Sequence, residues 1–251
     1  MVTPSFFVQF RMALGGWWRQ RIEHEGFVGA GRRLAREAWE FLRDSTPERK
    51  RQRYGDMDYD WEHRVNTTSG SVGWRERLLG VFHSAYQPTE PAAFQEMISG
   101  LPVDLSQFTF ADIGSGKGRT LLMASEYPFC RVLGLEILPE LHRAAQQNIR
   151  DYKSATQRCT AIESICVDAS EFEFPETPLV LYLFNPLPPV SLDRLLDNLW
   201  KSLQRSPRAI WMIYYNPLQQ EQLQSRAWLR PAHSGANFAI FQSGDEQSVP
   251  H

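Results

Sequence analysis

The sequence predicts an α/β fold in which a mostly parallel sheet is flanked by helices, and two features carry this prediction. Short apolar runs, typical of buried strands, alternate along the chain with segments whose apolar residues recur at helical spacing. A glycine-rich turn at residues 114–118, GSGKG, follows one of these runs and precedes a helical segment. The chain has 251 residues, and 42% of them are hydrophobic, which suits one α/β domain with an extension.

The glycine-rich turn lies within residues 108–119, FTFADIGSGKGR, which begin as a buried strand. Asp112 stands at the end of that strand, and glycine at alternate positions after it lets the backbone turn sharply and approach a ligand. A helix follows, and a second apolar strand at residues 131–135 ends on Glu136. Strand, glycine turn, helix, strand and acid form an arrangement that binds an adenosine-containing cofactor at the carboxyl ends of parallel strands.

The remaining elements alternate in the same way. Upstream of the glycine turn we expect a helix that starts at Pro91 with Thr89 as its N-cap and has an apolar stripe of Phe94, Met97, Ile98 and Leu101. Downstream of Glu136 we expect a helix at 139–150, a strand at 161–167, a central strand at 178–184, a helix at 191–203 capped by Ser191, a strand at 208–215, and an antiparallel pair at 228–229 and 237–242.

Composition and charge restrict the partners. The net charge is −2, so no strong basic field favours nucleic acid or an anionic membrane as a partner. The three cysteines, Cys130, Cys159 and Cys166, show no metal-ligand spacing and are expected to be reduced, buried thiols. No segment has the pattern of a membrane span or a secretory signal. We therefore expect a cytoplasmic protein without a metal site.

The first part of the chain differs in composition from the rest. Residues 1–60 are expected to form a helical extension and a charged linker, and residues 61–251 the main domain. Aromatic residues mix with arginines within residues 1–45, a pattern that suits peripheral contact with a membrane surface or docking of a partner. The simpler expectation is that these helices pack on the main domain as a lid or serve as a dimer arm.

The spacing of the glycines separates several nucleotide-binding families. A dinucleotide fold has G-x-G-x-x-G, and a P-loop has Ser or Thr after its lysine, whereas here Lys117 is followed by Gly118. The sequence D-x-G-x-G-x-G resembles motif I of the class I S-adenosylmethionine (SAM) methyltransferases, and the resemblance extends over residues 86–242. It implies a seven-stranded Rossmann-like methyltransferase sheet, mostly parallel with an antiparallel C-terminal strand. It also implies SAM as cofactor and S-adenosylhomocysteine (SAH) as product.

Two further motifs narrow the resemblance. YQPT at residues 86–89 precedes the glycine turn, and FNP at residues 184–186 follows the central strand. Together with GSGKGR they look like a bacterial group of methyltransferases, and their order is similar to that in the Dot1 histone-lysine methyltransferases. The likeness to Dot1 is one of motif order alone and assigns no histone substrate.

The resemblance implies cofactor contacts residue by residue. Glu136 would bind both ribose hydroxyls, and Asp168 with Ala169 would bind the adenine. Tyr86 and Thr89 would bind the SAM carboxylate or close the pocket. Lys117 and Arg119 either face the SAM carboxylate or only begin the helix. The implied cofactor site comprises Tyr86, Thr89, Asp112, Gly114, Ser115, Gly116, Gly118, Glu136, Ile137, Asp168, Ala169 and Asn185.

The resemblance assigns catalysis to Asn185, Pro186 and Tyr86. Asn185-Pro186 stands where amino-methyltransferases keep (D/N)PP(Y/F), whose Asn side chain and Pro carbonyl accept hydrogen bonds from the target N–H groups. Pro188 occupies the aromatic position of that motif, which argues against a stacked nucleobase. The other interpretation is a strand-ending turn enforced by prolines. His83, Tyr214 and Tyr215 are candidates for a general base or a pocket wall.

We therefore expect transfer of a methyl group to a nitrogen or oxygen of a small molecule or a protein side chain. A SAM-binding regulator without catalytic activity is one alternative. An NAD-dependent oxidoreductase is another, which the glycine spacing disfavours.

Overall fold

The computed structural model describes residues 57–67, 89–184 and 187–244. The chain divides into two compact units. One comprises Met1–Tyr59 and Ser69–Tyr86 and lies almost wholly outside the described residues. The other comprises Asp60–Thr68 and Gln87–His251, and the fold, site and contacts described below belong to it. The predicted boundary at residue 60 and the predicted helices of residues 1–45 stay predictions.

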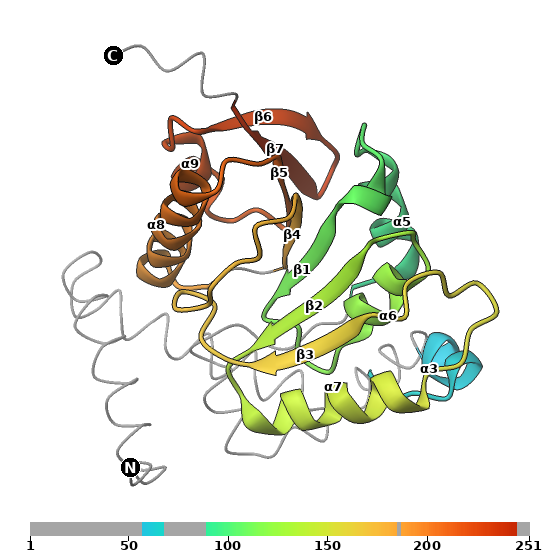
Figure 1. The fold of residues 1–251 in the computed structure, drawn as a ribbon. Coiled ribbons are helices and arrows are strands. Elements are labelled where there is room, and N and C mark those ends of the chain that lie inside the picture. Colours follow the sequence, from blue (N-terminus) through green and yellow to red (C-terminus); the bar gives the residue numbers. More distant parts are fainter. Residues whose placement is uncertain (1–56, 68–88, 185–186, 245–251) are drawn as a thin grey trace, which may run out of the picture. The chain divides into compact units, whose positions relative to one another are not determined.

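The described residues contain a seven-stranded sheet with the strand order β3-β2-β1-β4-β5-β7-β6 (Figure 1). The neighbours from β3 to β5 pair in parallel, and β7 pairs antiparallel with both β5 and β6. This confirms the predicted mostly parallel sheet with an antiparallel C-terminal end. The strands are β1 Thr109–Ile113, β2 Arg131–Glu136, β3 Ile162–Cys166, β4 Leu179–Phe184, β5 Ile210–Tyr215, β6 Leu229–Ser234 and β7 Phe238–Ser243.

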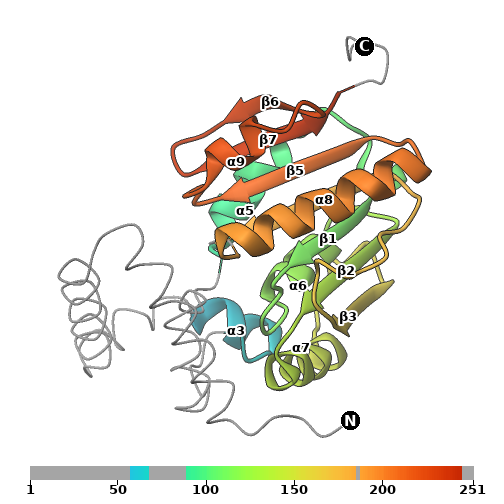
Figure 2. The ribbon, with the colours of Figure 1, turned by 90° about the vertical axis from the view of Figure 1, so that its left-hand side faces the viewer.

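Helices cover both faces of this sheet, as continuous apolar strands require. Figures 1 and 2 show α8 and α9 on one face and α5, α6 and α7 on the other. All residues of β1 are buried, and so are the first five residues of β4 and of β5, which explains their unbroken apolar sequence. The helices are α3 Met57–His63, α5 Pro91–Ser99, α6 Arg119–Ser125, α7 Pro139–Asp151, α8 Pro189–Arg205 and α9 Gln220–Gln224, and a 3-10 turn, η2, spans Leu105–Gln107.

The core lies on both sides of the sheet. On one side, four leucines of α8 are fully buried against β4 and β5, namely Leu192, Leu195, Leu196 and Leu199. On the other side, Phe94 of α5 meets Phe110 of β1 edge-on at 5.9 Å and Tyr182 of β4 at 6.0 Å between ring centroids. These two packed layers hold the carboxyl ends of the central strands in place.

The two edges of the sheet differ. β3 is one edge, and only Ser164 among its five residues is buried. β6 is the other edge, and all of its residues after Leu229 are exposed. β6 also carries Pro231, and its pairing with β7 is irregular between Pro231 and His233.

Several local predictions were wrong at the ends of helices. Ser191 does not cap α8, because the helix already begins at Pro189 with Pro188 at the N-cap position. Thr89 does not cap α5 either, since Glu90 is the N-cap residue and makes no side-chain capping bond. Proline within the first turn fixes the backbone angle that a helix needs, so neither start depends on a capping hydroxyl. Pro91 does lie in the first turn of α5, as predicted.

The prediction that all three cysteines are buried was also wrong. Cys159 is buried, whereas Cys130 and Cys166 are exposed, and all three are free thiols. Cys130 directly precedes β2, and Cys166 ends the edge strand β3. Within the described ranges, no group of three or more His, Cys, Asp or Glu residues has an arrangement that would hold a metal ion. None of the described helices is both long and apolar enough to cross a bilayer.

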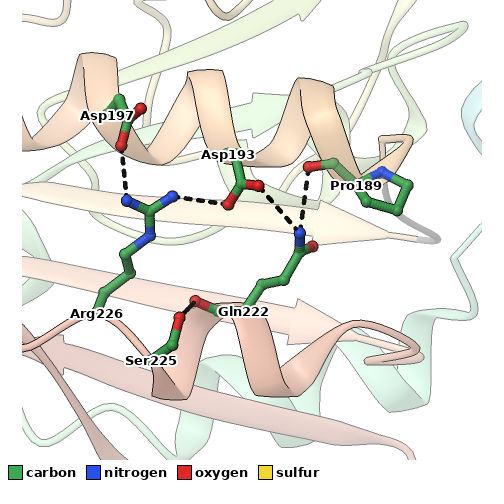
Figure 3. Close-up of polar contacts among 6 residues, drawn as sticks. All are labelled: Pro189, Asp193, Asp197, Gln222, Ser225 and Arg226. Carbon is green, nitrogen blue, oxygen red and sulfur yellow. Dashed lines mark hydrogen bonds and ion pairs between the residues drawn. The ribbon is translucent and has the colours of Figure 1, made fainter.

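A polar brace joins α8 to α9 and to Arg226, the second residue after α9 (Figure 3). The Arg226 guanidinium donates to Asp193 at 2.7 Å and to Asp197 at 2.6 Å. Gln222 of α9 donates to the Pro189 carbonyl at 3.3 Å and to the Asp193 carboxylate at 3.3 Å. The N-terminal half of α8 is therefore hydrogen-bonded to Gln222 and Arg226, which follow β5 in the chain.

Candidate functional site

The carboxyl ends of the parallel strands bring the glycine turn and Glu136 together. The Glu136 carboxylate, which is 5% exposed, accepts hydrogen bonds from the backbone N–H of Gly116 and of Leu138, each at 2.8 Å. Burial raises the pKa of Glu136, while these backbone hydrogen bonds oppose the rise. Because each carboxylate oxygen has a second lone pair, Glu136 can fasten the glycine turn and still accept a ligand hydroxyl.

The glycine turn has the backbone that its sequence predicts. Gly114, Gly116 and Gly118 all have positive φ, at 77°, 55° and 82°. Gly118 is the left-handed N-cap of α6. A side-chain carbon placed on Gly114 would meet no atom within 4 Å, so there is open space beside the turn at the end of β1. This is space that the methionine portion of a cofactor would fill.

Asp112 lies directly below the turn and is 3% exposed. The strand register places it between Gly134 of β2 and Tyr182 of β4. Burial and the charge of Glu136 raise the pKa of the Asp112 carboxyl to about 8, and a hydrogen bond with the Thr120 side chain opposes the rise only in part. A cationic ligand beside these two buried carboxyl groups would favour their charged forms, since an opposite charge nearby lowers the pKa of an acid.

Thr89 is brought to this site through Tyr182, a residue that the sequence analysis missed. The Thr89 and Tyr182 hydroxyls lie 2.7 Å apart and both side chains are nearly fully buried, at 2% and 1% exposure. Burial raises the pKa of Tyr182, and the charge of Asp112 adds to the rise. Tyr182 is also the register partner of Asp112 on the neighbouring strand, so Thr89, Tyr182 and Asp112 follow one another from the segment before α5 to β1. Tyr182 lies within an unbroken apolar strand sequence, so its hydroxyl gave no signal of a role at the site.

Both cations of the turn are buried, which favours neither of the two interpretations left open for them. Lys117 is 5% exposed and Arg119 is 2% exposed. Burial lowers the pKa of Lys117, and the charge of Asp60 opposes this. The charge of Asp60 therefore acts on Lys117 within the same compact unit, and the roles of Lys117 and Arg119 stay predictions.

Ser115 packs against β2. A side-chain carbon on Gly134 would lie 2.6 Å from the Ser115 Oγ, so the absence of a side chain at Gly134 makes room for this hydroxyl. The Ser115 hydroxyl is buried and has no hydrogen-bond partner among the described residues. Its role in the cofactor site stays a prediction.

The residues assigned to the adenine lie where β2 and β3 end. Ile137 directly follows Glu136 and is 56% exposed, which is unusual for a large apolar side chain. Asp168 follows β3 and is exposed, and its Oδ1 accepts from the Ser170 N–H and hydroxyl, each at 2.8 Å. Ala169 is buried. The assignment of these residues to the adenine stays a prediction.

The acceptor side falls mostly outside the described residues. Tyr86, His83, Asn185 and Pro186 all lie there. Among the described residues, Phe184 at the end of β4 packs on Tyr215 at the end of β5, with ring centroids 4.6 Å apart. Tyr214 is fully buried in the core, and its hydroxyl accepts from the Gln219 N–H at 3.2 Å. Of the two tyrosines, only the partly exposed Tyr215 is placed to line a pocket.

Part of the sequence matches a known protein family. Residues 106–195, which run from the start of β1 past the start of α8, match the family model described as "Putative methyltransferase". These residues belong to a methyltransferase family. With the seven-stranded sheet described above, this confirms the predicted class I SAM-dependent methyltransferase with a Rossmann-like fold. The narrower likeness to the GSGKGR/FNP group and to the Dot1 motif order stays a prediction.

Solved methyltransferase structures are similar to the chain at low identity. An RNA methyltransferase from Salinibacter ruber in complex with SAH is 20% identical, covers 65% of this chain and 97% of its own, and has a TM-score of 0.43. An O-methyltransferase from Thermotoga maritima is 15% identical, with coverage of 63% and 67% and a TM-score of 0.47. Magnesium protoporphyrin IX methyltransferase from Synechocystis is 12% identical, with coverage of 77% and 93% and a TM-score of 0.47. These likenesses leave the substrate of the methyltransferase open. No curated protein matches the chain.

Proposed function

We propose that this methyltransferase transfers a methyl group from SAM to a nitrogen or oxygen of a small molecule or a protein side chain. The observation that carries the proposal is the Glu136 carboxylate, which is buried at the end of β2 and hydrogen-bonded to the Gly116 N–H at 2.8 Å. This bond joins the acid assigned to the ribose to the turn assigned to the methionine portion.

The polar groups around the turn fit SAM better than a dinucleotide. SAM carries a sulfonium and an ammonium, whereas NAD carries a pyrophosphate. Glu136 and Asp112 are buried carboxyl groups that repel each other when both are charged, and burial together with the charge of Glu136 raises the pKa of Asp112. A cation near them relieves that repulsion, and a pyrophosphate adds to it. SAM supplies an electrophilic methyl group, and the chain supplies the position of the acceptor.

The acceptor is assigned to the end of β4, at Asn185 and Pro186. Methyl transfer is an in-line displacement, so the enzyme mainly has to orient the acceptor lone pair toward the methyl group. The Asn185 side-chain oxygen and the Pro186 carbonyl would accept hydrogen bonds from an N–H or O–H of the acceptor. The Phe184–Tyr215 pair would form the adjoining wall. Tyr86 is assigned to the same pocket.

Calorimetry and methyl transfer test this proposal. We expect the full chain to bind SAM and SAH and not NAD. Glu136→Ala should weaken SAH binding at least tenfold, because it removes charge-assisted hydrogen bonds worth about 1.5–3 kcal/mol each. Glu163→Ala is the matched control, since Glu163 lies on the neighbouring strand and pairs with Arg131 at the surface. Binding of NAD without SAM would overturn the cofactor assignment.

The acceptor assignment has its own test. Labelled SAM is incubated with the protein and a lysate that is then separated into metabolite, lipid, protein and nucleic-acid fractions. We expect label in the metabolite or protein fraction, and we expect Asn185→Ala to abolish transfer without changing SAH affinity. Full turnover by Asn185→Ala would show that the acceptor is positioned by other residues. Binding of SAH without transfer to any fraction would favour a SAM-binding regulator.

A further inference from the structure

Residues 60–67, which comprise the last turn of α3 and the four residues after it, form a segment closed by hydrogen bonds between its own two ends. The Asp60 carboxylate accepts the Thr67 N–H at 2.8 Å, and its other oxygen accepts the Thr67 hydroxyl. The Val65 N–H donates to the Asp60 carbonyl at 2.9 Å, and Arg64 has a positive φ of 57°. Asp60 is 8% exposed and Thr67 is fully buried. Because both partners of this hydrogen bond are buried, the segment has a defined conformation. We call it the 60–67 turn.

The 60–67 turn docks on α7 at two places. The first is near the C-terminal end of α7, where a His63 ring nitrogen lies 3.1 Å from the Lys153 carbonyl oxygen and the ring packs on Tyr152 at 5.2 Å. The second is Asn148, whose Oδ1 accepts the Asn66 N–H at 2.9 Å and whose Nδ2 donates to the Asn66 carbonyl at 3.1 Å. Asn148 thus pairs with the backbone of Asn66 in both directions, as one strand residue pairs with another.

Asn148 also reaches the glycine turn. Its Nδ2 donates to the Lys117 carbonyl at 2.9 Å, so one amide group bonds both the 60–67 turn and the centre of the GSGKG sequence. One turn of helix earlier, Ala145 packs against the same part of the chain, because a side-chain carbon on Gly118 would lie 3.1 Å from the Ala145 Cβ. Lys117 is further coupled to Asp60 by charge.

Asn148 occupies a position where an apolar side chain is expected. It continues the buried stripe of α7 that begins with Leu141 and Ala145, and it is 4% exposed. A buried amide is unfavourable unless its hydrogen bonds are made, at about 1–3 kcal/mol for each unpaired group. The contacts of Asn148 satisfy that requirement with bonds to two other segments, which a leucine at this position would not provide.

The bonded carbonyl lies at a sensitive point of the site. Lys117 stands between Gly116, whose N–H donates to Glu136, and Gly118, whose N–H donates to the Ser115 carbonyl at 2.8 Å. Glycine adopts many backbone conformations, so the positive φ values of these glycines are not enforced by their own residue type. Contacts with other residues must therefore stabilise this one conformation of the turn. The bond from Asn148 selects the orientation of the peptide that joins residues 117 and 118.

We propose that Asn148 is a positioning residue that holds the glycine turn in its cofactor-binding conformation, and that the 60–67 turn holds the Asn148 amide in the orientation that this requires. The proposal rests on the proposed function in assigning the cofactor to the glycine turn. It places one determinant of SAM affinity on α7 and in residues 60–67, outside the residues that would touch SAM.

The experiment compares three variants of the full chain. Asn148→Ala removes all three side-chain bonds, and Asn148→Asp keeps the size and the acceptor for the Asn66 N–H but removes both donated bonds. Asn198→Ala is the matched control. Asn198 is also an asparagine in a helix, α8, and its side chain donates to a backbone carbonyl, that of Phe172, at 2.8 Å. Amide hydrogen exchange of Gly116 and Gly118 is measured without ligand, and SAH affinity is measured by calorimetry.

We expect both Asn148 variants to exchange the Gly116 and Gly118 amides at least tenfold faster than the wild type and to bind SAH at least tenfold more weakly. Asn198→Ala should match the wild type in both readouts. The proposal would be overturned if the Gly116 and Gly118 amides of Asn148→Asp exchanged at the wild-type rate. It would also be overturned if these amides exchanged faster than in the wild type while the SAH affinity stayed unchanged. The exchange readout needs no cofactor, so failure of the wild type to bind SAH would overturn the proposed function separately.

Discussion

Asp112 is a carboxyl group that the fold holds away from water, next to a second acid. Its pKa of about 8 results from burial and from the charge of Glu136. At neutral pH the ligand-free protein therefore keeps a proton on Asp112 that the unfolded chain has lost. Stability and pH are linked through this proton.

We expect the ligand-free protein to become less stable as pH rises from 5 to 8. Between the ordinary aspartate pKa of 3.8 and about 8, native Asp112 binds a proton and unfolded Asp112 does not, so unfolding releases a proton and higher pH favours unfolding. The raised pKa of Glu136 acts in the same direction. Thermal unfolding measured by circular dichroism at several pH values checks this.

Asp112→Asn is the matched control for the pH prediction, because it keeps the shape and removes the titrating proton. Its melting temperature should vary less between pH 5 and 8 than that of the wild type. An equally steep loss of stability in Asp112→Asn would show that other groups cause the dependence.

At this scale the sequence predicted where Asp112 and Glu136 lie along the strands better than it predicted their contacts. The positions of Asp112 and Glu136 followed from the glycine spacing and the strand that comes next. The hydrogen bond between Glu136 and Gly116 could not be predicted from the sequence, because it depends on how closely β2 lies to the turn. Asn148 was missed, although a polar residue on the buried stripe of an amphipathic helix is a signal that a sequence can carry.

At the scale of elements, β2 and α6 come close to each other where β2 has Gly134. A side-chain carbon there would lie 2.5 Å from the Leu121 Cδ1 and 2.9 Å from the Ser115 Cβ. The missing side chain therefore lets the first turn of α6 and the glycine turn lie against the strand. Gly134 was part of the predicted strand, but its packing requirement is a contact between two elements and is not visible in either sequence alone.

Gly134→Ala should lower the free energy of unfolding by about 1–3 kcal/mol, because overpacking forces the turn or the Leu121 side chain away from β2. Denaturant unfolding measures this change. The double variant Gly134→Ala/Ser115→Gly should recover part of the loss, since it removes the Ser115 atoms that the new methyl group meets. A fully stable Gly134→Ala would show that the turn adapts without cost.

Two short helices, α3 and α9, were not predicted, and the other errors at this scale lay at element ends. The predicted strands and helices of the described residues appeared where apolar spacing placed them, whereas the caps of α5 and α8 did not. Hydroxyl groups near a helix start are a common cap, but prolines at 91 and 189 set the starts of these helices. Thr89 was then free to pair with Tyr182, a partner 93 residues away.

At the scale of the whole described unit, the strand order could not be read from local patterns. Periodicity predicts which segments are strands, whereas the order β3-β2-β1-β4-β5-β7-β6 depends on which segments meet in space. The family resemblance predicted a mostly parallel seven-stranded sheet with an antiparallel C-terminal strand, but it did not state the order of the strands. The brace between α8 and α9 was not predicted, because Arg226 and its two aspartates are about 30 residues apart in a charged surface sequence.

We expect Arg226→Gln to lower the free energy of unfolding by about 1 kcal/mol, because one guanidinium serves two carboxylates and its side chain is only 25% exposed. Arg143→Gln is the control, since Arg143 is 65% exposed and pairs only with Glu140 within one helix. The difference between Arg226→Gln and the wild type should shrink in 1 M NaCl as the charges are screened. Equal losses in the two variants would mean that the brace adds nothing.

The irregular edge strand β6 has a consequence for the protein in concentrated solution. An open strand edge offers a row of unpaired backbone groups to any other strand that approaches. Pro231 has no N–H to offer, and the irregular pairing between Pro231 and His233 interrupts the even spacing that an incoming strand needs. β6 is therefore a poor template for sheet extension between molecules, which limits aggregation at this edge of the sheet.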